Sequence, residues 1–241
     1  RLIASGGIIE PSASAIRDST GNERIMLKWE NKPSPQVVSN SMSSGYELEG
    51  SIRCVRWLDE VTFCVGYASG AVEVWDTLRG EVVARLLGHE RAITTLALLN
   101  HDEIKNARKS IFIVSGSRDK TVRIWRLDDS LGHDCDTLYG HTEAISSVVV
   151  ATAINELFSA AGNEIRCWSC SPGYPLLYLF DTDYKSPLSS ISLSPDLSYM
   201  VTAFLDGTMR VWAFTLAESA SSMVMASRSI SNRSGQSDDL S

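Results

Sequence analysis

The sequence predicts an all-β protein built from repeated four-stranded units. Five of its six tryptophans end short segments whose apolar residues alternate with polar ones, in the two-residue period of a β-strand. These tryptophans recur at intervals of 43 to 50 residues, and such a period is typical of repeat architectures. A turn signal and another apolar run precede each segment. The five are Trp29, Trp75, Trp125, Trp168 and Trp212.

The best-formed repeat shows the expected strands in order. Its four apolar runs are "AITTLALL" (92–99), "IFIVSG" (111–116), "KTVRIWR" (120–126) and "DTLY" (136–139). Most of the other repeats carry the same runs in the same order, and amphipathic helical patterns are almost absent. Four short antiparallel strands in about 40 to 45 residues are the pattern of one blade of a β-propeller.

The repeats divide the chain into one long domain and a tail. We expect a propeller segment over 1–216 and a serine-rich, disordered tail over 217–241, with a candidate fourth strand of the last blade at 221–227. The expected blades are a partial blade 0 at about 1–45 and blades 1 to 4 at about 50–88, 89–140, 141–182 and 183–216. In blade 0 the first strand is missing, and the turn between its second and third strands is expanded into residues 8–23. A second insertion, 100–110, joins the first two strands of blade 2.

Short motifs identify a family. Gly88-His89 and Gly140-His141 each precede a first strand, and Trp75-Asp76 ends a third strand. In these motifs the chain resembles the WD-repeat (Trp-Asp repeat) family over about residues 1–214. The resemblance implies a β-propeller of four-stranded blades that binds other proteins, in a ring that usually holds seven or more blades. We therefore expect the C-terminal blades of a longer propeller. A five-bladed ring and an open blade set completed by a partner are the alternatives.

The resemblance also implies a hydrogen-bonded tetrad inside each blade. The complete tetrad is His89, Ser115, Asp119 and Trp125 in blade 2. Such a network gives every polar atom in a dry interior a partner, and it stiffens a blade only when each member is satisfied. Partial tetrads are His141, Ser159 and Trp168 in blade 3, and Thr202, Asp206 and Trp212 in blade 4. Blade 3 has Gly162-Asn163 where the aspartate is expected, the acidic residues 181–183 stand near the histidine position of blade 4, and blade 1 has Val65 and no histidine.

Residue types of a catalytic triad are present in blade 2, but the pattern favours structure over catalysis. Ser115 lies within an apolar strand, and no group nearby is suited to stabilise an oxyanion. No phosphate-binding loop, dinucleotide fingerprint or nucleophile elbow is present. Histidine and acidic residues share the polar loops 100–103 and 132–136, where solvated side chains are the commoner outcome. We expect no enzyme, no cofactor and no metal.

Composition limits the partners and the compartment. The net charge of −7 and the pI of about 5.1 argue against broad nucleic-acid binding, and no apolar run is long enough to span a membrane. The five cysteines are an odd, scattered set, which favours a reducing compartment, the cytoplasm or the nucleus. Cys167 and Cys170 have the Cys-x-x-Cys spacing but no second pair of ligands.

Protein–protein interaction remains as the expected function, with proteins or peptide motifs as partners rather than nucleic acid or small molecules. Turns at one end of the blades supply the candidate contacts Arg91, Arg118, Lys120, Glu143 and Leu205. The two arginines suit an acidic or phosphorylated motif. One alternative is a substrate receptor of a ubiquitin ligase, because residues 75–79, "WDTLR", resemble the Trp-Asp-x-Arg box with the arginine one position late. Another is a coat- or pore-type component whose open propeller a partner completes.

Overall fold

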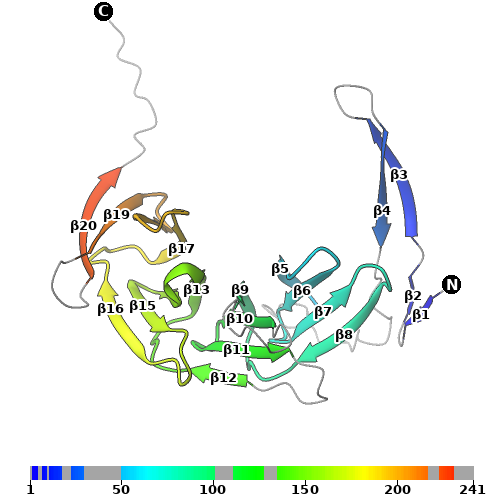
Figure 1. Ribbon diagram of the computed structural model, residues 1–241, viewed down its shortest axis with the longest axis horizontal. Helices are drawn as coiled ribbons and strands as arrows, with labels where there is room; N and C mark the ends of the chain where they lie inside the picture. Colours follow the sequence, from blue (N-terminus) through cyan, green and yellow to red (C-terminus); the bar gives the residue numbers. More distant parts are fainter. Residues whose placement is uncertain are drawn as a thin grey trace, which may run out of the picture.

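The computed structural model describes residues 50–100, 111–127, 135–216 and 223–230, together with four short strands before residue 30. Side chains are described over 50–99, 111–127 and 135–213. Four antiparallel sheets of four strands each follow one another along the chain. They stand in a curved, open row (Figure 1). The prediction of an all-β chain of four-stranded blades is therefore confirmed.

Each sheet contains consecutive strands in chain order. Blade 1 is formed by β5 (Ile52–Trp57), β6 (Thr62–Tyr67), β7 (Val72–Asp76) and β8 (Glu81–Leu86). Blade 2 is formed by β9 (Ile93–Asn100), β10 (Ile111–Ser117), β11 (Val122–Leu127) and β12 (Cys135–Leu138). Blade 3 is formed by β13 (Ile145–Ala151), β14 (Glu156–Ala161), β15 (Glu164–Ser169) and β16 (Leu176–Asp181), with a short 3₁₀ helix, η2 (Thr152–Ile154), after β13. Blade 4 is formed by β17 (Leu188–Leu193), β18 (Tyr199–Phe204), β19 (Met209–Leu216) and β20 (Met223–Ile230).

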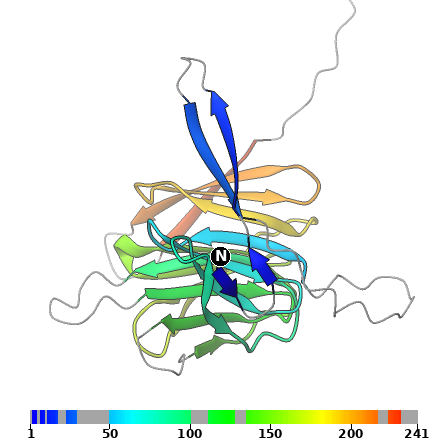
Figure 2. The ribbon, with the colours of Figure 1, turned by 90° about the vertical axis from the view of Figure 1, so that its right-hand side faces the viewer.

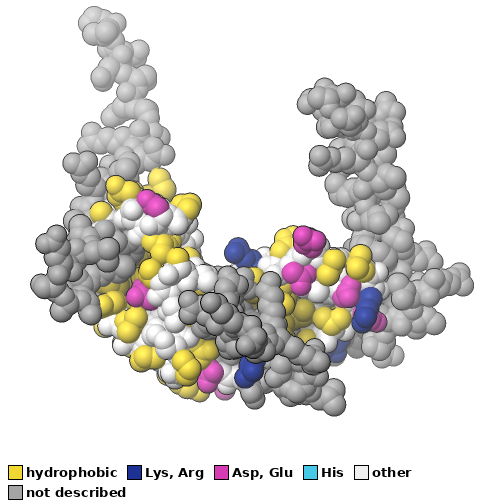
Figure 3. Space-filling model, viewed as in Figure 1, with side chains coloured by type: hydrophobic (Ala, Val, Ile, Leu, Met, Phe, Trp, Pro, Cys, Tyr) yellow, Lys and Arg dark blue, Asp and Glu magenta, His cyan; other side chains and the backbone are white. Residues whose placement is uncertain are grey.

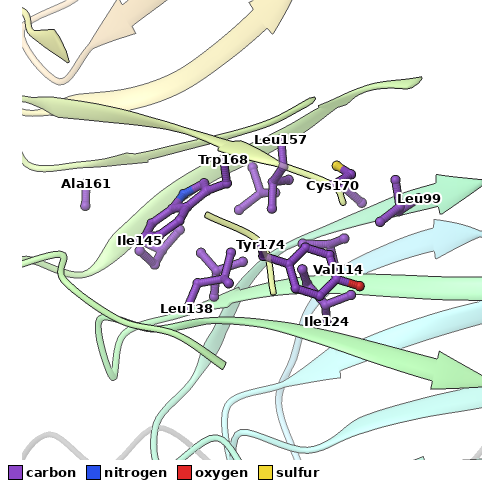
Figure 4. Close-up of a cluster of buried hydrophobic side chains, with 13 residues drawn as sticks. Leu99, Val114, Ile124, Leu138, Ile145, Leu157, Ala161, Trp168, Cys170 and Tyr174 are labelled. Atoms are coloured by element: carbon purple, nitrogen blue, oxygen red, sulfur yellow. The ribbon is translucent and has the colours of Figure 1, made fainter. Parts of the chain in front are cut away.

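Hydrophobic cores lie between neighbouring blades rather than inside one sheet. The first strands of successive blades are in contact: β5 with β9, β9 with β13, and β13 with β17. Figure 4 shows the core between blades 2 and 3, where Val114 and Ile124 face Leu157 and Trp168. A strand buried on both faces reads as a nearly continuous apolar run, which explains the run "IFIV" in β10. Each fully buried aliphatic side chain contributes about 1.5–3 kcal/mol.

The two ends of the row expose apolar faces that the middle blades bury. In β5, Val55 and Trp57 are each more than half exposed, whereas the equivalent strand of blade 3, β13, is largely buried. At the other end Tyr199 and Val201 are exposed on β18. Among the described strands, no blade covers these two faces. In the described part of the chain, no helix is long and apolar enough to cross a membrane.

The N-terminal region differs from the expected partial blade. It forms two separate hairpins, β1 (Leu2–Ala4) with β2 (Gly7–Ile9), and β3 (Pro11–Arg17) with β4 (Glu23–Trp29). Figure 2 shows the β3–β4 hairpin standing apart from the blades. The expectation that residues 8–23 form one expanded turn is wrong, because β3 lies inside that range and pairs with β4 along its whole length.

The last blade extends further than expected. β20 pairs with β19 from Met209 opposite Ile230 to Leu216 opposite Met223. It contains most of the candidate fourth strand expected at 221–227, which is therefore confirmed, and it continues to Ile230. Blade 4 thus extends past the expected boundary at residue 216, into the region expected to be a disordered tail. The reason is that β19 would otherwise have an unpaired outer edge, and the apolar run that begins at Met223 supplies a strand for it. The insertion expected in blade 2 lies mostly outside the described residues.

Candidate functional site

The structure brings the four predicted tetrad residues of blade 2 together in one chain of hydrogen bonds. His89 lies between β8 and β9, Ser115 on β10, Asp119 in the β10–β11 turn and Trp125 on β11. The Nδ1 atom of His89 lies 2.7 Å from Asp119 Oδ2, and its Nε2 atom lies 2.8 Å from Ser115 Oγ. The indole N–H of Trp125 donates to the same Ser115 Oγ at 2.8 Å. The serine hydroxyl thereby links strand, loop and indole.

Asp119 also organises the turn itself. Its Oδ1 accepts from the Thr121 backbone N–H at 2.9 Å and from the Thr121 hydroxyl at 2.6 Å. Its Oδ2 accepts from the Glu90 backbone N–H at 3.1 Å, in the loop that carries His89. Between these contacts Lys120 has a φ of 73°, a left-handed conformation that costs a residue with a side chain roughly 1 kcal/mol or more. The carboxylate therefore holds a strained turn against the preceding loop.

Electrostatics favour a neutral imidazole beside an ionised carboxylate. Burial lowers the pKa of His89 below its usual 6.5, although Asp119 acts in the opposite direction. Burial alone would raise the pKa of Asp119, but the hydrogen bonds from Thr121 and His89 outweigh it and lower the pKa. We therefore assign Nδ1–H of His89 as the donor to Asp119, and the Ser115 hydroxyl as the donor to Nε2.

This order of contacts matches a Ser-His-Asp triad, yet burial prevents triad chemistry. Ser115 is completely buried, and its oxygen is engaged by both His89 and Trp125. A nucleophilic serine needs an open side from which a substrate carbonyl can approach, and oxyanion donors beyond it. The geometry supports a structural network in place of a reactive one.

Blade 3 builds the same network with a residue that the sequence reasoning missed. His141 Nε2 lies 2.7 Å from Ser159 Oγ, and the Trp168 indole donates to that oxygen at 2.9 Å. The carboxylate beside His141 Nδ1, at 2.6 Å, is Glu164 on β15. Burial lowers the pKa of His141 in the same way as that of His89. The available signal was the spacing, because Glu164 stands four residues before its tryptophan, as Thr121 does in blade 2.

Arg166, on the third strand of blade 3, contacts both Glu164 and the loop that carries His141. Arg166 pairs with Glu164 at 3.1 Å and donates to the Gly140 carbonyl at 2.9 Å. Gly140 has a φ of 129°, and a Cβ there would lie 2.1 Å from the Arg166 guanidinium. The backbone conformation therefore requires the glycine of the Gly-His motif, and a side chain there would also displace the flexible end of Arg166.

Blade 4 keeps half of the network and replaces its histidine. The Trp212 indole donates to Thr202 Oγ1 at 3.0 Å, as the partial tetrad predicts. Tyr184 occupies the histidine position, four residues before the first strand of its blade, and its hydroxyl donates to Asp206 at 2.8 Å. The Arg210 guanidinium lies 4.4 Å from the Tyr184 ring centroid. Tyr184 thus joins the loop before β17 to Asp206 in the β18–β19 turn.

Blade 1 has no such network among its described residues. Val65 stands at the position of Ser115 and is buried. The Trp75 indole nitrogen is buried near the Tyr67 side chain, but it makes no well-formed hydrogen bond in the described part of the chain. Nearby, the Tyr67 hydroxyl donates to Glu73 at 2.8 Å. Burial and Glu73 both raise the pKa of Tyr67.

The candidate contact residues of blade 2 lie together at the turn end of the blade. Arg91, Arg118 and Lys120 are all exposed. The Arg118 backbone N–H donates to the Ala92 carbonyl at 2.9 Å, and the Ser117 hydroxyl donates to the Arg91 carbonyl at 2.9 Å. The loop before β9 and the β10–β11 turn are therefore joined directly. We define Arg91, Arg118 and Lys120 as the basic edge.

The remaining candidates lie on the corresponding loops of the next two blades. Glu143 is exposed beside the Gly162 turn, where a Cβ would lie 3.1 Å from its side chain. Leu205, in the β18–β19 turn, is 70% exposed and is held by a hydrogen bond from its backbone N–H to the Pro187 carbonyl at 3.0 Å. Both residues therefore project from the same type of loop as the basic edge, but on separate blades.

The arginine of the ligase-like motif lies in the turn between β7 and β8. Arg79 is 68% exposed at its side chain and lies 3.6 Å from Asp76 and 3.8 Å from Glu81. Asp76 also accepts from the backbone N–H groups of Leu78 and Arg79 at 2.8 and 3.0 Å. The turn folds the guanidinium back onto its own acidic neighbours.

The cysteines show no reactive or metal-binding arrangement in the described residues. All five thiols are free, and no group of three potential ligands is placed to hold a metal in the described part of the chain. Burial raises the pKa of Cys54 to about 11 and that of Cys170 to about 12. The Cys167 thiol donates to Glu156 at 3.3 Å. The loop 100–103 and most of 132–136 lie outside the described residues.

Comparison with known proteins agrees with this architecture. The model of the family "WD domain, G-beta repeat" matches residues 80–126 and 175–213. Nuclear distribution protein PAC1-1 of Uncinocarpus reesii is 32% identical over 146 residues, which cover 54% of this chain and 32% of that protein. Pre-mRNA-processing factor 19 of Oryza sativa subsp. japonica is 26% identical, covering 60% of this chain and 27% of that protein. Protein ROOT INITIATION DEFECTIVE 3 of Arabidopsis thaliana is 25% identical, covering 94% of this chain and 50% of that protein.

Solved structures show the same fold. The C-terminal WD40 domain of Sif2 matches with a TM-score of 0.53 and 26% identity, covering 66% of this chain and 42% of that one. A chain of the mitotic checkpoint complex matches with a TM-score of 0.55 and 22% identity, covering 67% of this chain and 49% of that one. The chain spans about a quarter to a half of the length of the curated relatives named above.

Proposed function

Because the chain belongs to the WD40-repeat family, we propose that it serves as a protein–protein interaction platform without catalysis of its own. The observation that carries the proposal is the basic edge: three exposed cations on turns that the His89 network holds in place. Binding residues are commonly placed on loops that a rigid scaffold positions. The scaffold here is the hydrogen-bonded turn, and the binding groups are the side chains that project from it.

The chemistry of the basic edge favours an acidic or phosphorylated segment of a partner. Arg91 and Arg118 present guanidinium groups, which bind carboxylate and phosphate with two parallel hydrogen bonds. Lys120 adds a third positive charge in the same turn. The overall charge of −7 makes this local group of cations distinct from the rest of the chain. We place the protein in the cytoplasm or nucleus, which agrees with its five free thiols.

Quantitative affinity purification of the full chain tests the platform. The double variant Arg91→Glu/Arg118→Glu is compared with wild type, and Arg126→Glu is the control, because Arg126 is exposed near the other end of the same blade. We expect the double variant to lose specific partners that the control retains, with equal thermal stability in all three proteins. An unchanged set of partners in the double variant would refute the role of the basic edge.

A ubiquitin-ligase substrate receptor is the second candidate, favoured by the exposure of Arg79. Direct binding of the purified ligase adaptor to wild type, and its loss in Arg79→Ala, would support this function. Because Arg79 lies at the β7–β8 turn and not on the basic edge, the two sets of variants separate the two functions. A coat- or pore-type component completed by a partner is the third, and it would use the exposed end face around Trp57.

A further inference from the structure

The outer strand of blade 3 differs from the outer strands of blades 1 and 2. β16 carries three exposed leucines, Leu176, Leu177 and Leu179, and no charge before Asp181. In the space-filling view, hydrophobic side chains lie at the surface along the outer side of blade 3, where Figure 1 places β16 (Figure 3). Natural β-sheet proteins usually protect an edge strand with charge, shortness or a covering element. β16 lacks the first two, and no described strand pairs with its outer side.

The other outer strands show the protection that β16 lacks. β8 is as long as β16, but it carries Glu81 and Arg85, and Arg85 pairs with Glu73 at 3.0 Å. β12 has only four residues, and one of them is Asp136. These are the devices that discourage pairing with a foreign strand. β16, by contrast, is a six-residue edge strand with apolar side chains and no central charge, which is the pattern of an edge that pairs with a strand of another protein.

The register shows which backbone groups face outward. The Thr182 N–H donates to the Asn163 carbonyl at 2.9 Å, so these two residues form a hydrogen-bonded pair. Residues of an antiparallel ladder alternate between hydrogen-bonded and non-hydrogen-bonded pairs. Leu179, opposite Arg166, therefore belongs to a non-hydrogen-bonded pair, and its N–H and C=O point away from β15. At Leu179 the edge therefore offers both an exposed side chain and backbone N–H and C=O groups that face away from β15.

We propose that β16 is a second docking site, which takes an extended segment of a partner protein as a fifth strand of blade 3. Main-chain hydrogen bonds to the outward groups of Leu179 would supply affinity, as in other cases of strand addition. Selectivity would come from apolar side chains at alternate positions, beside Leu177 and Leu179, in a segment whose centre carries no charge. A second copy of the chain fits less well, because the register shift opposite Cys167 and Trp168 leaves only a short regular ladder for self-pairing.

Selection from a library of random peptides displayed on phage, with the full chain as bait, tests this site. We expect enrichment of peptides with apolar residues at every second position, and slower amide exchange of residues 177–181 when a selected synthetic peptide binds. Leu179→Lys should weaken that peptide by about tenfold or more. Leu179→Pro should do the same, because it removes the outward N–H and leaves the ladder to β15 intact. Thermal unfolding checks that both variants fold.

The matched control is Val83→Lys, on the already protected outer strand of blade 1, where Val83 is 48% exposed. It should retain wild-type affinity, as should the Arg91→Glu/Arg118→Glu variant, so the site is tested independently of the basic edge. The absence of alternating peptides, equal binding to Leu179→Lys, or protection at another strand would each overturn the proposal. A concentration-dependent dimer of the chain that Leu179→Lys abolishes would also overturn it, because the occupant would then be a second copy.

Discussion

Blades 1 and 2 differ at the strand position that faces the tryptophan indole. In blade 2, Ser115 accepts the Trp125 N–H and contacts His89, so every polar group of the network has a partner. In blade 1 the position is Val65, and the buried Trp75 N–H makes no well-formed hydrogen bond in the described part of the chain. An unmade buried hydrogen bond costs about 1–3 kcal/mol. Interblade apolar packing therefore suffices to form a blade, and the network adds stability and fixes the turn.

The largest expected effect comes from removing the carboxylate of blade 2. Asp119→Ala leaves the His89 imidazole and the backbone N–H groups of Glu90 and Thr121 without their acceptor. We expect the free energy of unfolding to fall by about 3 kcal/mol, because several donors, among them the buried His89 imidazole, lose a charged partner together. Urea denaturation measures it. A loss within about 0.5 kcal/mol, typical of an ordinary surface substitution, would contradict the network.

A smaller loss is expected in blade 3. Glu164→Ala removes the acceptor of His141 and the partner of Arg166, and both of these contacts are with side chains rather than with turn amides. We expect a loss of about 1–2 kcal/mol in the same urea experiment. A loss larger than that of Asp119→Ala would show that the imidazole contact matters more than the turn amides.

Acid should weaken both complete networks. The pKa values of His89 and His141 are lowered by burial, so the unfolded chain takes up protons first as the pH falls below 6.5. Stability contributed by each neutral histidine is therefore lost below pH 6.5, by up to about 1.4 kcal/mol per pH unit per histidine. Urea midpoints measured between pH 7.5 and pH 5.5, about one unit on either side of 6.5, should fall with acidification. Midpoints that stay constant or rise would contradict the neutral, buried assignment.

The smallest expected change is a gain in blade 1. Val65→Thr gives the Trp75 N–H an acceptor, as Thr202 does for Trp212 in blade 4 at 3.0 Å. We expect a stabilisation of about 0.5–1 kcal/mol by urea denaturation, the net value of one added hydrogen bond. Val65→Ala is the control, and it should destabilise by removing buried methyl groups. If Val65→Thr were as destabilising as Val65→Ala, the position would be purely apolar.

The sequence predicts the blades well because tryptophan spacing and strand alternation both follow from interblade packing. It predicts the blade 2 tetrad because each residue stands at its usual position. Glu164 was missed because it stands two residues closer to its tryptophan than Asp119 does, and its longer side chain still reaches His141. Tyr184 escaped because a different side chain performs only part of the histidine role. β3 and β20 form because each has a strand to pair with, and the local sequence pattern alone does not show this. The sequence therefore did not predict β3, and it gave β20 only as a candidate strand.

The unfolding free energy of Ser115→Val tests the central claim most directly, because it places the blade 1 residue in the blade 2 network. The valine fills the space of the completely buried serine, but it leaves the Trp125 N–H and the His89 Nε2 without a partner. We predict a loss of about 2–3 kcal/mol in urea, with the loss from Asp119→Ala reduced in the double variant because the two residues act in one network. Unchanged stability in Ser115→Val, or simple additivity with Asp119→Ala, would contradict the claim that these four side chains form one structural unit.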